Sequence, residues 1–169
     1  MMQVVTLHRN EIAYDVELAS WRIAKTHFAE DLKSASEGKI GDDVSDWLDR
    51  QIASGVSEVK RKIAFAITDK NTMSACNGIG DCDDCDCSCG DDGDGRTVLY
   101  LRFGEGWRGN LDVLVSDIHD YVVSRVLFEW LVMTAPAFAN VYEAKADRHL
   151  DRIVSEARSE VIRTPRFVL

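Results

Sequence analysis

Hydrophobic positions recur at helical spacing in the first half of the chain. Apolar residues at positions 12, 16, 19 and 23 predict an amphipathic helix that begins beside Asn10, a suitable N-cap, and fades near His27. A second apolar face, at positions 44, 48, 52, 56, 59 and 63, predicts a helix that Asp42 or Asp43 caps and that fades around Thr68. Gly55 lies inside this second pattern and indicates a close crossing or a bend.

Two more helices are predicted in the second half of the chain. The first covers about residues 111–134, and in its later part, "VLFEWLVM" from Val126, apolar residues occur on every side. A helix that is apolar all round is buried all round. Pro136 fits the first turn of the next helix, where its missing N–H costs nothing. The short break before Pro136 requires an antiparallel or sharply bent pair.

One strand interrupts the helical pattern. The segment "RTVLYLRF" (96–103) is rich in β-forming residues and alternates between two faces. Its backbone requires a hydrogen-bonding partner, either the chain at about 67–75 as a hairpin or a neighbouring subunit. The fold class expected is therefore mainly α, a four-helix bundle with a strand or β-hairpin inserted between helices 2 and 3. We expect one domain over 1–169, with a flexible insert at 74–95 and an extended tail at 163–169.

The net charge is concentrated in that insert. The 169-residue chain carries a formal charge of −9, and the seven aspartates between Asp81 and Asp94 supply −7, which leaves −2 for the rest. The body is thus near neutral, and no basic cluster is dense enough for a nucleic-acid site; "VKRKIAF" comes nearest. The sequence also lacks a signal-peptide pattern and an apolar run long enough to span a membrane, so no membrane partner is expected.

The insert "SACNGIGDCDDCDCSCGDDGDG" contains all five cysteines and admits several interpretations. Cys82, Cys85, Cys87 and Cys89 form a C-x-x-C-x-C-x-C run that supplies four thiolates for zinc or another soft metal. The run lacks a second, distant knuckle, the calcium-loop pattern fails at its glycine and glutamate positions, and disulfides between near neighbours stabilise little. A solvated acidic loop without a cofactor is the main expectation, with zinc at these four cysteines as the alternative.

Catalytic signals are absent elsewhere in the sequence. The four histidines are scattered, although His119 and His149 each have aspartates nearby and could face each other if their helices are antiparallel. An interhelical polar contact is the main expectation for them, with a metal site or an acid–base pair as the alternative. Arg125 and Glu129, four residues apart in an apolar helix, predict a buried or interfacial ion pair. No nucleophile elbow, Walker loop or Rossmann glycine pattern occurs. An enzyme is not expected.

The segment from Arg96 to Arg158 resembles a family of small proteins of tailed bacteriophages that infect Bacteroides-type hosts. The resemblance is carried by the "VLYLRF" strand, the I-H-x-Y-V-V-x-R-V-L-x-x-W-L run at Ile118–Leu131, the Thr-Ala-Pro at 134–136 and the aromatic- and lysine-containing helix after it. These proteins act as neck or head–tail connector components. The insert at 74–95 has no counterpart that we can place in the family.

The resemblance implies a structural virion protein, assembled in the host cytoplasm and located in the phage neck. It implies a homo-oligomeric ring, commonly of about twelve copies, that joins the portal protein to tail or neck proteins and lets double-stranded DNA pass through its lumen. The apolar third helix and the chain end would supply the contacts to other subunits: Tyr121, Arg125, Phe128, Glu129, Trp130, Arg166, Phe167, Val168 and Leu169. The alternative function is soft-metal binding by a small helical protein through residues 82–89.

Overall fold

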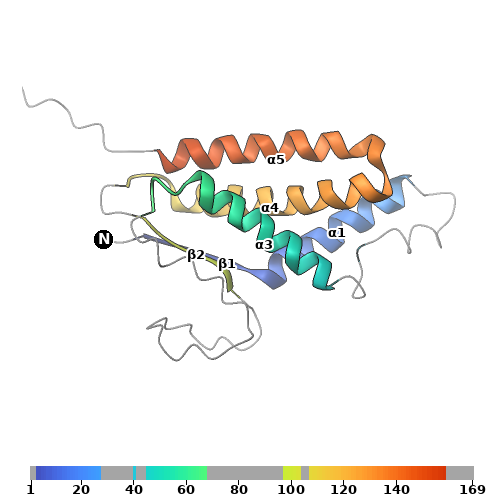
Figure 1. Ribbon diagram of the computed structural model, residues 1–169, viewed down its shortest axis with the longest axis horizontal. Helices are drawn as coiled ribbons and strands as arrows, with labels where there is room; N and C mark the ends of the chain where they lie inside the picture. Colours follow the sequence, from blue (N-terminus) through green and yellow to red (C-terminus); the bar gives the residue numbers. More distant parts are fainter. Residues whose placement is uncertain (1–2, 28–39, 41–44, 68–96, 104–106, 159–169) are drawn as a thin grey trace, which may run out of the picture.

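The computed structural model of the chain describes residues 3–27, 40, 45–67, 97–103 and 107–158, which form a helical body with a small sheet at one side (Figure 1). The elements follow in the order β1 (Gln3–His8), α1 (Arg9–His27), α3 (Ser45–Lys62), β2 (Thr97–Phe103), α4 (Leu111–Thr134) and α5 (Pro136–Ala157). The prediction of a mainly helical fold with four helices is confirmed.

Helix α4 is the centre of the fold. It packs most extensively against α5, and it also contacts α3, α1 and β1. Figure 1 shows α5 lying along α4, with α3 and α1 crossing it on other sides. Because neighbours from the same chain surround α4, its apolar positions are buried on nearly every side, among them Leu114, Ile118, Val122, Val126, Leu127 and Leu131, each at most 1% exposed.

The two strands form one antiparallel ladder, and this corrects the expected strand partner. β1 pairs with β2 in a register that sets Val5 opposite Leu101 and Leu7 opposite Leu99. The segment after α3 contributes only an isolated bridge, Ile67 to Phe103, and residues 68–75 lie outside the described residues. The hydrogen-bonded ladder to β1 satisfies backbone groups of β2. The side chains of Val5 and Leu7 add to the core that β2 already faces, which favours this pairing.

Both ends of the α4–α5 unit have clear local causes. The Asn110 side chain accepts hydrogen bonds from the backbone N–H groups of Asp112 and Val113, at 3.1 and 3.4 Å, and thereby caps α4. Ala135 alone separates α4 from α5, and Pro136 takes the first position of α5, as predicted. The first helix begins at Arg9, so Asn10 lies inside its first turn and is not the cap.

An aromatic clasp connects β2 to the far end of α5. Trp107 stacks on Phe103 with ring centroids 4.4 Å apart, and its indole N–H donates to the backbone oxygen of Glu156 at 3.2 Å. Gly109 passes so close to this indole that a Cβ there would lie 2.2 Å from a ring carbon. The clasp thus joins the chain that follows β2 to the end of α5, while β2 itself packs on β1 and α3.

Candidate functional site

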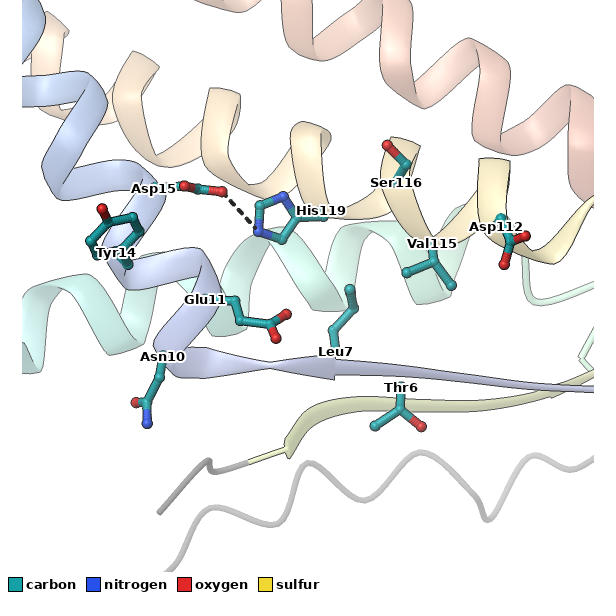
Figure 2. Close-up of a pocket in the computed structure, with 10 residues that line it drawn as sticks. All are labelled: Thr6, Leu7, Asn10, Glu11, Tyr14, Asp15, Asp112, Val115, Ser116 and His119. Atoms are coloured by element: carbon teal, nitrogen blue, oxygen red, sulfur yellow. Dashed lines mark ion pairs between the residues drawn. The ribbon is translucent and has the colours of Figure 1, made fainter. Parts of the chain in front are cut away.

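A groove of about 730 Å³ opens between the first turns of α1, the end of β1 and the first half of α4 (Figure 2). Leu7 and Val115 give it an apolar floor, and the carboxylates of Glu11, Asp15 and Asp112 lie around it. The groove forms because β1 runs directly into α1 at Arg9, which brings the start of α1 beside α4.

The groove holds serine, histidine and aspartate side chains, but their arrangement differs from that of a catalytic triad. His119 directs Nε2 toward Asp15 of α1 at 3.5 Å (Figure 2). Its Nδ1 lies 4.0 Å from Asp120. Both ring nitrogens therefore face carboxylates, and no hydrogen bond connects the ring to Ser116 in the described part of the chain. The pair His119–Asp15 instead bridges α1 and α4 at one end of the groove.

The charged side chains that line the groove are mainly acidic. Three carboxylates line it against a single imidazole, and none of its lining residues in the described structure is lysine or arginine. Tyr14, 64% exposed, adds an aromatic side chain beside the acidic rim. A cationic group that also carries apolar surface matches this lining better than an anion does, because opposite charges attract and the floor is apolar.

Three of the residues expected at a subunit interface form an intramolecular polar cluster between α3 and α4. The Tyr121 hydroxyl donates to Glu58 Oε2 at 2.7 Å, and Arg125 lies 4.0 Å from the same oxygen. Arg125 also contacts Glu129 at 2.8 Å, so the predicted ion pair at i, i+4 is confirmed, and it is half-buried. Glu58 is the member that sequence patterns did not indicate, because it comes from a helix far away in the sequence.

The residues expected at a subunit interface differ in how deeply the chain itself buries them. Tyr121 and Trp130 are 2% and 7% exposed within this chain, which corrects them from partner-contacting to core positions. The reason is that α3, α5 and α1 already cover the sides of α4 that the sequence assigned to neighbouring copies. Phe128 is half-buried beneath the Arg125 guanidinium, 5.1 Å from its ring centroid. Residues 166–169 lie outside the described residues.

Burial and the hydrogen bond to Glu58 raise the pKa of Tyr121 above its usual value of 10.0. The unfolded chain therefore releases this proton above pH 10 while the folded chain retains it, so the free energy of unfolding falls with rising pH. We expect Tyr121→Phe to reduce that fall by up to about 1.4 kcal/mol per pH unit above pH 10. Urea unfolding of both proteins at pH 9, 10 and 11 measures how the free energy of unfolding changes with pH. The same pH dependence in both proteins would contradict the prediction.

A second polar pair links α4 to α5. His149 Nδ1 lies 2.8 Å from Asp117 Oδ1, and both side chains are 10% exposed. Arg152 approaches the same carboxylate oxygen at 3.7 Å from the surface. The expected interhelical polar contact is confirmed for both histidines, and each imidazole pairs with an aspartate of another helix rather than with the other histidine. These contacts hold helices together, and the His119–Asp15 pair is the one that lies in the groove.

The proposed metal ligands Cys82, Cys85, Cys87 and Cys89 lie outside the described residues, as does the whole insert at 74–95. Within the ranges that the structure describes, no three His, Cys, Asp or Glu side chains converge in a way that would hold a metal ion. None of the four described helices combines the length and apolarity that crossing a membrane requires.

Comparison of the chain with protein-family models, with curated proteins and with solved structures finds no match.

Proposed function

We propose that the protein is a structural subunit of a homo-oligomeric ring, of the head–tail connector kind that its second half resembles. In this role it joins portal to tail or neck proteins in the phage neck and lets double-stranded DNA pass through the lumen. In the segment behind the resemblance α4 packs along α5, and the Trp107 clasp ties Phe103 of β2 to the end of α5, which fits a structural task better than a catalytic one.

The observation that carries the proposal is a set of exposed apolar side chains around the turn between α4 and α5. Val132 and Met133 at the end of α4 are 45% and 63% exposed, and Phe138 and Val141 at the start of α5 are 38% and 66% exposed. We call these four residues the apolar tip. Large apolar side chains gathered at one place on a surface mark a protein contact more often than scattered ones do.

Helix α1 carries further apolar surface that the chain itself leaves uncovered. On α1, Tyr14 and Trp21 are exposed seven residues apart and so lie on the same side of the helix. The core of α4 needs no partner, so assembly would rest on these outer positions and leave the fold unchanged. A near-neutral to acidic surface favours DNA passage, because tight DNA binding depends on basic contacts to phosphates.

The test is the mass of the full chain by light scattering, alone and with portal protein, for the native sequence and two variants. Met133→Asp with Val141→Asp should abolish the ring, because two buried carboxylates at a contact are strongly unfavourable. Ser54→Asp, an exposed position in the middle of α3, is the matched control and should leave the ring intact. A native chain that remains monomeric both alone and with portal protein would refute the proposal.

A further inference from the structure

The groove has a counterpart of opposite charge elsewhere on the same chain. The last turn of α3 presents Arg61 and Lys62 to solvent, and Phe65, three residues further on, is 58% exposed. The guanidinium of Arg158, at the end of α5, lies 5.6 Å from the centroid of the Phe65 ring. We call Arg61, Lys62, Phe65 and Arg158 the basic end.

Among the described residues, the cations of the basic end have little competing charge. The Arg61 side chain is 75% exposed, and its contact to Glu58 is long, at 3.8 Å. Glu58 also accepts a hydrogen bond from the Tyr121 hydroxyl at 2.7 Å, so its negative charge is shared between Tyr121 and Arg61. Lys60, in the same turn, is buried at 6% exposure and is not part of this surface.

The basic end and the groove match in both chemistry and form. The groove offers an apolar floor at Leu7 and Val115 within a rim of carboxylates, as Figure 2 shows. The basic end offers one exposed aromatic ring, with the Arg158 guanidinium over it and with Arg61 and Lys62 in the helical turn that precedes it. An aromatic ring inserted on an apolar floor, with its flanking cations meeting the acidic rim, removes apolar surface from water and pairs the charges.

In a single chain these two surfaces are built from different elements. The groove belongs to β1, α1 and the first half of α4, whereas the basic end belongs to the ends of α3 and α5. No ion pair in the described part of the chain joins the two surfaces. A contact between unlike surfaces of two identical copies is heterologous, and a series of such contacts generates a ring when the rotation closes.

We infer that the groove binds the basic end of a second copy of this chain, with Phe65 on the floor formed by Leu7 and Val115 and the cations against Glu11, Asp15 and Asp112. This inference rests on the proposed function, because it names the contact that repeats around the ring. The apolar tip then serves contacts that are separate from this repeated one.

The test is a charge exchange between the two surfaces, with mass by light scattering as the readout. One variant carries Glu11→Lys and Asp112→Lys, and the other carries Arg61→Glu and Lys62→Glu. Each alone places like charges together, so we expect the association between copies to weaken by about a hundredfold or more. An equimolar mixture of the two variants restores opposite charges at every contact and should assemble again.

Two further variants complete the design. Phe65→Ala leaves the charges unchanged and should also weaken association, because it removes the aromatic ring from the floor. Arg22→Glu with Arg50→Glu reverses two exposed arginines outside both surfaces and should assemble like the native chain. Circular dichroism of every variant checks that its helices are intact.

The outcomes separate the inference from the proposed function. If the native chain assembles and the charge-reversed variants assemble equally well, the groove is not the contact, while the ring proposal stands. If the reversed variants fail singly and their mixture fails too, the pairing of these two surfaces is wrong. If the native chain never assembles, even with portal protein, the proposed function and this inference fall together.

Discussion

Trp130→Ala should lower the free energy of unfolding of the single chain by about 3–5 kcal/mol. The indole is 7% exposed and lies among side chains of this chain's own helices, so its removal leaves a cavity that the surrounding core closes only partly. Urea unfolding, at a protein concentration where the chain is monomeric, measures the change in the free energy of unfolding. If Trp130 were buried only by a neighbouring subunit, its substitution would change the stability of the assembly and not that of the monomer.

Val132→Ala is the matched control for this substitution, two residues further along the same helix. Its side chain is 45% exposed, so truncation removes little buried surface, and we expect a change of less than about 1 kcal/mol. Equal effects of the two substitutions would show that α4 is not embedded in its own chain as the structure describes.

Asp117→Ala should destabilise the chain by about 2–3 kcal/mol, because it leaves the imidazole of His149 buried without its hydrogen-bond partner. The contact joins α4 to α5, the two helices that pack most extensively, so its loss weakens the principal helix pair. Thermal and urea unfolding near neutral pH measure the effect. The conservative Asp117→Asn retains an oxygen acceptor and should cost less.

Asp151→Ala provides the comparison for Asp117→Ala. Asp151 is exposed on α5, two residues from His149, and its replacement brings the same gain in helix propensity without breaking a buried contact. We expect a change within about 0.5 kcal/mol. An Asp117→Ala protein that is as stable as Asp151→Ala would show that the His149 contact contributes nothing.

The helices of the second half could be predicted closely because strong local signals mark their ends. Pro136 marks the start of α5, and the apolar run of α4 stops just before it. Strand β1 was not predicted, because six residues at the chain start carry little periodicity and their partner, β2, lies about ninety residues further on. Pairing over such a separation depends on the assembled core, which local patterns do not describe.

The prediction that the apolar run of α4 is buried on every side is right for Val126, Leu127, Trp130 and Leu131 but wrong at its end, where Val132 and Met133 are exposed. The residues that bury the rest were not predicted. A pattern that is apolar on every side is the same whether the cover comes from one chain or from several. Here α1, α3 and α5 provide the cover, so Tyr121 and Trp130 lie in the core. The ion pair Arg125–Glu129 was predictable because both residues lie on one helix, four positions apart.

The groove could not be predicted, because its residues come from three elements that meet only in the fold. Glu11, Asp15 and Asp112 are ordinary first-turn or surface acids when each is considered in its own helix. The same holds for the basic end, where Phe65 and Arg158 are far apart in the sequence and meet through the packing of α3 beside α5. Only the folded chain shows that acids collect at one surface and cations with an aromatic ring at another.

The proposed role is tested most directly by counting this chain in purified phage particles by quantitative mass spectrometry, relative to the portal protein. A ring seated on the portal predicts a fixed number of copies per particle, about twelve, in constant ratio to portal from one preparation to the next. Absence of the chain from mature particles, or a number near that of the major capsid protein, would contradict the role of a neck connector.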